Sequence, residues 1–172
     1  MQVSLIVGTR DSGKSTWLGD YAVRNRASGI LSEKRFVEGR FIGYDARLFA
    51  GGAPGEAMPF LWESDSPGEV DAAGDGEWFA YRRFSFNSGV FRLAMQASES
   101  WASPVIIDEV GPLEMEGRGF AMLLTKLVPR LAQDSGSRLL ISVRPDLADG
   151  LRREFLPGDA EVKLVYPGGA NL

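Results

Sequence analysis

The chain has 172 residues and a mass of 18.7 kDa, which is the size of one domain with a sizeable hydrophobic core. Its formal net charge of −4 and pI of about 5.0 give no electrostatic support for binding nucleic acid. It contains no Cys and no His, which excludes disulfides, thiolate nucleophiles, imidazole bases and the usual zinc ligand sets. A bound metal would therefore be held by oxygen, which suits Mg²⁺.

The start of the chain shows no export signal. An apolar segment begins at residue 3, which leaves no room for a signal peptide. No apolar run approaches the roughly 20 residues that span a bilayer. We expect a cytoplasmic protein without membrane contact.

A glycine-rich loop lies between a strand and a helix near the N-terminus. Residues 3–7 are a continuous apolar run typical of a buried strand, and residues 17–26 have helical character. The segment 8–16 between them fits the pattern G-x-x-x-x-G-K-[ST] of a phosphate-binding loop. Strand, glycine-rich turn and helix is the context that this motif requires. The alternative is an ordinary glycine-rich connection.

The motif assigns chemistry to the loop. Backbone N–H groups would wrap the phosphates, and the helix N-terminus adds partial positive charge. Lys14 would act in catalysis by reaching the β- and γ-phosphates, and the Ser15 hydroxyl would ligate Mg²⁺. The expected nucleotide-binding residues are Gly8, Thr9, Arg10, Asp11, Ser12, Gly13, Lys14, Ser15 and Thr16.

The region after the first helix predicts strands and hairpins. A short strand is expected at 30–31, a charged turn at 32–39, a half-exposed antiparallel strand at 40–49 and a short strand at 58–62. The polar residues 64–76 predict a solvated loop, because their carboxylates match no calcium-loop spacing. Residues 78–86 are aromatic around Arg82 and Arg83, which favours a strand pair, with stacking on a base as the alternative.

From residue 87 onward, helices alternate with apolar strands. Asn87 is a candidate N-cap, and the periodicity predicts helices at 90–101, 120–131 and 146–155 and strands at 105–107, 138–143 and 161–166. This alternation predicts an α/β fold with a mostly parallel central sheet covered on both faces. We expect residues 1–172 to form a single domain, with a β-rich insertion of antiparallel strands at about 35–86.

A phosphate-binding loop needs an acidic partner at the end of a nearby buried strand. Residues 104–109 (Pro-Val-Ile-Ile-Asp-Glu) supply one. Asp108 would hold Mg²⁺, and Glu109 would polarise or deprotonate the water that attacks the γ-phosphate. The alternative is a strand that ends in solvated charges.

Residues 108–115 (Asp-Glu-Val-Gly-Pro-Leu-Glu-Met) resemble the D-E-[IV]-G-x-[ML]-E signature of a small nucleoside-triphosphatase family, first described in thermophiles and also present in animals. Residues 29–33 and 39–44 resemble its G-f-x-t-x-E and G-x-R-x-G-F segments, and 84–101 its strand and helix before the acidic motif. The likeness covers nearly the whole chain. It implies a three-layer, RecA-like P-loop NTPase fold and Mg²⁺-dependent hydrolysis of nucleoside triphosphates to diphosphates, with low base selectivity.

The chain also departs from that family. Its loop lacks the usual middle Gly and carries Arg10 and Asp11, and Asp11 would face phosphate unless it points outward or pairs with Arg10. Arg144 stands where a polar or His sensor is expected; it would act as an arginine finger or bridge surface carboxylates. Arg118, after the acidic motif, is a second candidate for the arginine finger. Glu114 would support the site or favour a helix start.

These features favour a nucleoside triphosphatase that uses ATP or GTP, with Mg²⁺ as cofactor and no nucleic-acid partner. Two alternatives remain at this stage: a small-molecule or nucleotide kinase of the same fold, and a nucleotide-binding adaptor without significant hydrolysis. The sequence shows no Arg-rich lid of the kind that a kinase would use. A protein partner is not indicated.

Overall fold

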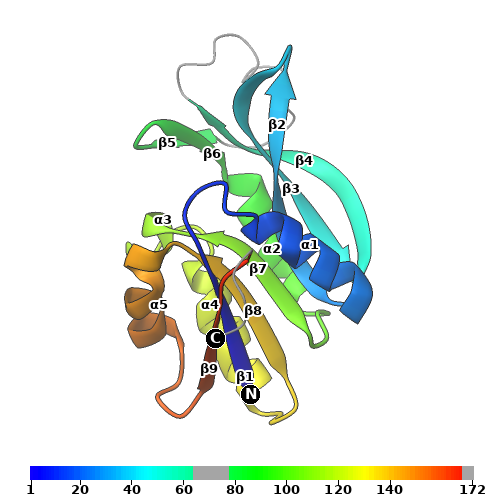
Figure 1. Cartoon of the computed structure of the whole chain (residues 1–172), viewed down its shortest axis with the longest axis vertical. Helices are drawn as coiled ribbons and strands as arrows, with labels where there is room; N and C mark the ends of the chain where they lie inside the picture. The colour runs from blue at the N-terminus through cyan, green and yellow to red at the C-terminus, as the bar shows by residue number, and fades with distance from the viewer. Residues whose placement is uncertain (64–77, 168–172) are drawn as a thin grey trace.

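The computed structural model of the protein describes residues 1–63 and 78–167, so the loop expected at 64–76 lies outside the described residues. The strands are β1 (Gln2–Val7), β2 (Ser28–Val37), β3 (Arg40–Ala50), β4 (Ala53–Glu63), β5 (Trp78–Tyr81), β6 (Phe84–Asn87), β7 (Val105–Val110), β8 (Arg138–Val143) and β9 (Glu161–Val165). Together they form one sheet in the order β5-β6-β4-β3-β2-β7-β8-β1-β9 (Figure 1).

The helices begin and end close to the expected positions. They are α1 (Lys14–Asn25), α2 (Ser88–Ser98), α3 (Pro112–Met115), α4 (Ala121–Ala132) and α5 (Ala148–Phe155), with a short 3₁₀ helix at Pro145–Leu147. The N-cap expected at Asn87 is confirmed, because its Oδ1 accepts a hydrogen bond of 2.9 Å from the Gly89 N–H. The 3₁₀ helix occupies the first part of the segment expected to be helical at 146–155.

The sheet has a parallel half and an antiparallel half. Strands β2, β7, β8, β1 and β9 pair in parallel. Strands β2, β3, β4, β6 and β5 pair in antiparallel fashion. The expectation of a mostly parallel sheet is therefore wrong for the sheet as a whole. The connections β2–β3, β3–β4 and β5–β6 are too short for the crossover that a parallel pair requires, so each makes a hairpin.

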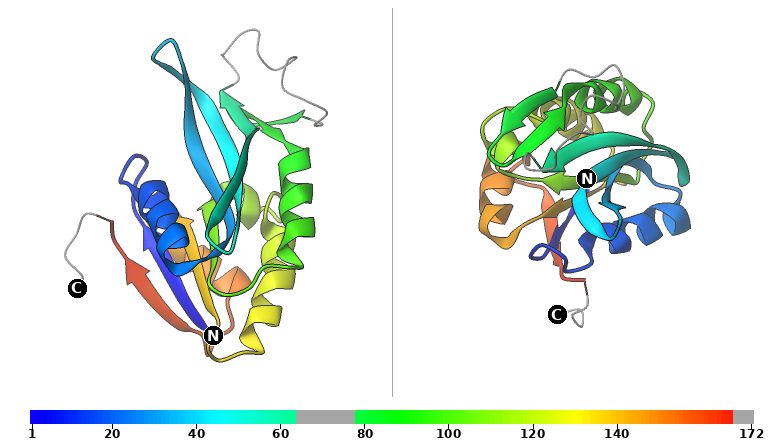
Figure 2. Two further views of the ribbon diagram at one scale, coloured as in Figure 1. Left: turned by 90° about the vertical axis from the view of Figure 1, so that its right-hand side faces the viewer. Right: turned by 90° about the horizontal axis from the view of Figure 1, so that it is seen from above.

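Helices cover the parallel half on both faces. In the left view of Figure 2, α1 lies on one side of the sheet and α2 and α4 lie on the other. Side chains alternate accordingly along β1, where Leu5 belongs to the core beneath α2 and α4 and Ile6 to the core beneath α1. This three-layer arrangement places the carboxyl ends of β1, β7 and β8 at one edge, where ligands bind in sheets of this kind.

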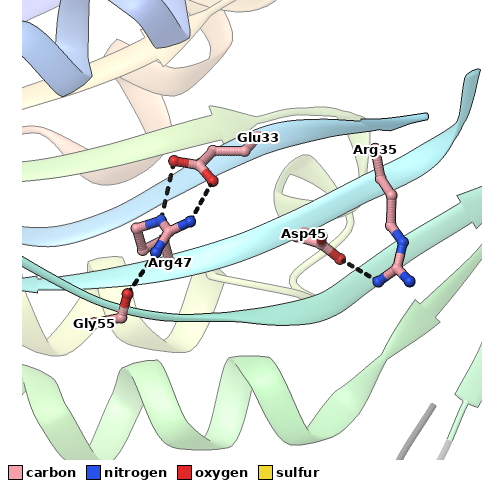
Figure 3. A network of polar contacts seen from close by, with 5 residues as sticks. All are labelled: Glu33, Arg35, Asp45, Arg47 and Gly55. Carbon is pink, nitrogen blue, oxygen red and sulfur yellow. Dashed lines mark hydrogen bonds and ion pairs between the residues drawn. The ribbon is translucent and has the colours of Figure 1, made fainter. Parts of the chain in front are cut away.

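The segment 32–39 is not a turn. Residues 32–37 continue β2 into a long hairpin with β3, and only residues 38–39 turn the chain. Charged side chains face each other diagonally across the hairpin (Figure 3). Arg47 donates to both carboxylate oxygens of Glu33, at 3.0 and 2.9 Å, and Arg35 donates to Asp45 at 3.3 Å. These cross-strand pairs let a charged sequence remain extended.

Other boundaries also differ from the expectations. Strand β4 begins at Ala53, well before the short strand expected at 58–62, and includes Pro54 and Pro59, so only residues 51–52 turn the chain between β3 and β4. The aromatic segment 78–86 is a hairpin with Arg82 and Arg83 at its turn. Among the described helices, none has both the length and the apolar character to cross a membrane.

The buried face of α4 should carry much of the stability. Leu124 is fully buried between α4 and the sheet, whereas Met122 on the same helix is 64% exposed. Leu124→Ala should lower the free energy of unfolding by about 2–5 kcal/mol, because it leaves a cavity in a packed core. Urea unfolding should show a small change for Met122→Ala. Equal losses for the two variants would contradict this packing.

Candidate active site

The loop between β1 and α1 turns at two glycines. A Cβ added to Gly8 would lie 2.1 Å from Ser12 Oγ, so a larger residue here would force the Ser12 side chain to move. Gly13 adopts φ 87°, in the left-handed region, immediately before α1 begins. No side chain caps α1, and its first N–H groups therefore remain available to an anion.

Lys14 lies inside the curve of this loop. Its side chain is buried, and Nζ donates a hydrogen bond of 2.8 Å to the Thr9 carbonyl. The Ser12 hydroxyl is buried and has no hydrogen-bond partner among the residues that the structure describes. A buried hydroxyl without a partner is costly, and a ligand oxygen at the loop would satisfy it.

A cavity of about 650 Å³ opens from the loop. That volume lies in the range of sites for small molecules and cofactors. The cavity is lined by residues 10–16 of the loop, by Gly19, Asp20 and Val23 of α1, by parts of β2, β3 and β4, and by Glu109. Within it, Lys14 and Ser15 face the end of β7.

Asp108 is fully buried at that end of β7. Its oxygens accept hydrogen bonds from the backbone N–H groups of Ser32 (3.1 Å) and Glu109 (3.0 Å) and from the Ser142 hydroxyl, and the Ser15 hydroxyl lies close enough to lower the Asp108 pKa. Desolvation raises the pKa of Asp108, and these hydrogen bonds oppose the rise. A buried carboxylate of this kind calls for a cation beside it.

A bulge turns Glu109 into the cavity. Three steps along β7 from Ile107 to Val110 match two steps along β8, and Glu109 takes φ 62° at this irregularity. Its N–H is held by Asp108 and, at 2.8 Å, by Ser142 Oγ. Desolvation and the Asp108 carboxylate raise the pKa of Glu109, although its side chain is open to the cavity.

Ser15 and Asp108 offer oxygen ligands for a divalent cation. The described residues contain no group of three or more His, Cys, Asp or Glu side chains that would hold a metal alone. One hydroxyl and one carboxylate fit Mg²⁺, which usually keeps several waters and shares ligands with substrate phosphates. The donor set and the burial of a carboxylate that has hydrogen-bond donors but no ion-pair partner among the described residues therefore fit this ion.

Arg10 and Asp11 contact the β2–β3 hairpin. Asp11 forms an ion pair with Lys34, and the Arg10 guanidinium lies 4.9 Å from the centroid of the Phe41 ring. A hydrogen bond from Lys34 lowers the pKa of Asp11, so this carboxylate is charged within the glycine-rich loop. Asp11 thus pairs with Lys34 rather than with Arg10, and the extended hairpin supplies the neutralising charge.

Glu114 holds together two parts of the backbone that follows β7. Its oxygens accept hydrogen bonds from Gly111 N–H at 2.7 Å and from Phe120 N–H at 3.0 Å. It joins the start of α3 to the start of α4, and it is 3% exposed. Desolvation raises its pKa to about 7, against the effect of these hydrogen bonds.

Arg144 and Arg118 lie in different surroundings. Arg144 follows β8, pairs with Asp146 at 2.7 Å and lines a second cavity together with Lys14 and Glu109. Arg118 stacks on the rings of Phe79 and Tyr81, at 4.8 and 5.6 Å, and lines neither cavity beside the loop. In the structure, Arg144 therefore lies near Lys14 of the glycine-rich loop, whereas Arg118 lies against the rings of β5.

Sequence reasoning missed Ser142, Ser32 and Lys34. Ser142 is a single hydroxyl residue in a mostly apolar strand, and it is fully buried. Because a buried hydroxyl needs a polar partner, its position in that strand is the signal that could have identified it. Ser32 and Lys34 were assigned to a turn, and they reach the loop only because β2 is extended.

No family model matches the chain, and no curated protein sequence matches it. Among solved structures, the chain is similar to the solution structure of a human cancer-related nucleoside triphosphatase. The TM-score is 0.58 with 15% identity, and the match covers 96% of this chain and 87% of that one. The similarity is one of fold. It supports an NTPase-like α/β architecture, while the specific family suggested by the acidic motif stays a prediction.

Glu114 should make stability fall as pH rises. In the folded state its pKa is raised from 4.5 to about 7, so the folded protein binds the proton more tightly than the unfolded chain. The resulting stabilisation is full below pH 4.5 and is lost as pH rises through about 7.

Unfolding free energies measured across this range should show the slope in the wild type and a smaller slope in Glu114→Gln, because Asp108 and Glu109, whose pKa values are also raised, still contribute. The variant should also be less stable throughout, because the amide nitrogen cannot accept one of the two backbone hydrogen bonds. Glu154→Gln, an exposed change on α5, should keep the wild-type slope. An unchanged slope in Glu114→Gln would refute this assignment.

Proposed function

We propose that this protein is a Mg²⁺-dependent nucleoside triphosphatase that hydrolyses ATP, GTP and other nucleoside triphosphates to diphosphate and phosphate. The supporting observation is one constellation: buried Asp108 beside Ser15, with Glu109 turned into the cavity that Lys14 also lines. The similarity of fold to a nucleoside triphosphatase adds support.

The phosphate loop would bind the triphosphate. Free N–H groups at the start of α1 would bind its oxygens, and the Ser12 hydroxyl would gain the partner it lacks. The Lys14 ammonium would exchange its bond to the Thr9 carbonyl for the β- and γ-phosphates. Its charge would stabilise the oxygens of the transferring phosphoryl group, where negative charge is spread in the transition state.

Ser15 and Asp108 would hold Mg²⁺. When bound, the ion neutralises phosphate charge and helps to orient the triphosphate. The protein contributes the fixed position of Asp108, which hydrogen-bond donors from β2, β7 and β8 hold in place. Such preorganisation avoids reorganisation during the reaction.

Glu109 would position and deprotonate the attacking water. A left-handed conformation is unfavourable for Glu by roughly 1–2 kcal/mol, and the hydrogen bonds to its N–H maintain it. A regular strand would instead place residues 108 and 109 on opposite faces of the sheet. The bulge therefore lets two adjacent carboxylates serve one site, one beside the metal ligands and one beside the water.

Glu109→Gln should reduce steady-state hydrolysis by about 10²–10⁴-fold, because the amide cannot take a proton from water. Triphosphate binding, measured by calorimetry with a non-hydrolysable analogue, should remain. Glu154→Gln is the matched control and should hydrolyse at the wild-type rate. The assay is phosphate release from ATP and GTP with Mg²⁺. Wild-type turnover by Glu109→Gln would contradict this role.

The Asp11–Lys34 pair should govern triphosphate affinity. Lys34→Ala leaves the Asp11 carboxylate unneutralised beside the phosphates, which should raise the Kd for ATP through like-charge repulsion. In an Asp11→Asn background, the same Lys34 change should have a much smaller effect. A double-mutant cycle by calorimetry measures this coupling.

Lys126→Ala, an exposed change on α4, provides the control and should leave the affinity unchanged. If Lys34→Ala weakened ATP binding equally with and without the Asp11 carboxylate, Lys34 would contact the nucleotide directly and the neutralising role would be wrong.

A further inference from the structure

A second cavity, of about 220 Å³, adjoins the proposed nucleotide site. It lies past the carboxyl ends of β7 and β8 and is bordered by the β5–β6 hairpin. The two cavities share five lining residues: Arg10, Lys14, Ser32, Tyr44 and Glu109. A molecule in the second cavity would therefore lie beside the terminal phosphate of a bound triphosphate, on the Glu109 side.

The second cavity is larger than the space that an attacking water molecule requires. A water molecule occupies about 30 Å³ in the liquid, so one attacking water needs only a small part of this space. At the same time, 220 Å³ lies below the range of about 300–1,000 Å³ typical of sites for drug-sized ligands. The cavity therefore fits a small organic molecule next to the reacting phosphate.

The lining indicates the chemistry of that molecule. Rings and aliphatic side chains form much of the wall, including Phe60, Phe84, Phe86 and Leu113. Five cationic side chains also line the cavity, against the two carboxylates Glu109 and Glu114. Apolar walls with an excess of cations suit a compound with an aromatic or apolar body and an anionic group.

The β5–β6 hairpin carries two of these cationic side chains. Arg82 and Arg83 form the turn between β5 and β6, with their guanidinium groups 5.3 Å from the Tyr81 ring and 4.9 Å from the Phe84 ring. Arg83 pairs with Glu63 at 3.8 Å, but its side chain is 62% exposed, so this ion pair is weak and can exchange for a ligand anion. The aromatic contacts of Phe86 with Phe60 and Phe91 fix the hairpin against α2.

We propose that the second cavity binds a small alcohol with an apolar or aromatic body and an anionic group, and that the protein transfers the γ-phosphoryl group to it. This proposal rests on the proposed nucleotide site, because the donor is the same triphosphate. It adds a phosphotransferase activity to hydrolysis.

The transfer balances without a further reactant. The acceptor hydroxyl oxygen attacks the γ-phosphorus and forms a new P–O bond, while the bond from that phosphorus to the β–γ bridging oxygen breaks. The bridging oxygen leaves with its electron pair on the nucleoside diphosphate. The hydroxyl proton passes to the Glu109 carboxylate and then to solvent.

Three related compounds at millimolar concentration test the proposal with the full chain, ATP and Mg²⁺. The probe 4-(hydroxymethyl)benzoate carries the ring, the carboxylate and the hydroxyl. The compound 4-methylbenzoate lacks the hydroxyl, and benzyl alcohol lacks the anion. ADP and phosphate are measured in parallel, and phosphorus NMR detects the phosphate ester.

With 4-(hydroxymethyl)benzoate, ADP formation should exceed phosphate release, and the ester should account for the difference. With 4-methylbenzoate, both products should decrease together, because the compound displaces the attacking water. Benzyl alcohol should have little effect. If no compound changes either rate and no ester forms, the proposal is wrong. Inhibition by both benzoates without ester would leave a binding site and overturn the transfer.

Variants separate this cavity from the nucleotide site. Arg82→Glu should abolish the excess of ADP over phosphate, whereas Arg152→Glu, an exposed change on α5 outside both cavities, should preserve it. Ester formation that survives Arg82→Glu in a variant with a wild-type unfolding midpoint would place the acceptor elsewhere. If the protein does not hydrolyse triphosphates, the result is different. It then releases no phosphate when no acceptor is present, whether or not an ester forms when an acceptor is added.

Discussion

The buried carboxylate of Asp108 is the group on which the rest of the site depends. Its hydrogen-bond donors come from β2, β7 and β8, so its position is fixed only when these strands are assembled. Full burial of such a group is unfavourable unless donors and a cation compensate for the lost solvation. The same bonds that hold Asp108 also hold the N–H of Glu109, and through it the bulge that turns Glu109 into the cavity.

The antiparallel half of the sheet is continuous with the parallel half and completes the site from the other side. It carries Lys34 to Asp11 and Phe41 to Arg10, which gives the unusual charges of the phosphate loop their partners. Exposed ion pairs contribute little to stability in general. Here their effect would be electrostatic, because Asp11 without Lys34 would repel the triphosphate that we propose the loop binds.

The same half of the sheet borders both cavities. Strands β2, β3 and β4 form a wall of the larger cavity, and the β5–β6 hairpin forms a wall of the smaller one. Lys14 and Glu109 line both, so a phosphoryl group between them would be reached by a molecule from either side. With water as that molecule, the reaction would be hydrolysis. With an alcohol in the arginine-lined space beyond Glu109, it would be phosphoryl transfer.

The sequence by itself determined the elements that rest on local patterns: the glycine-rich turn around Gly8 and Gly13, the N-cap at Asn87, and the burial of residues 105–107 before Asp108. These follow from residue type and spacing, because backbone geometry and side-chain periodicity act over a few residues. Only the tertiary structure decided that residues 32–37 extend β2, that Lys34 pairs with Asp11, and that Ser142 holds Asp108. Each of these contacts joins strands that are distant in the sequence, where pairing and burial outweigh local propensity.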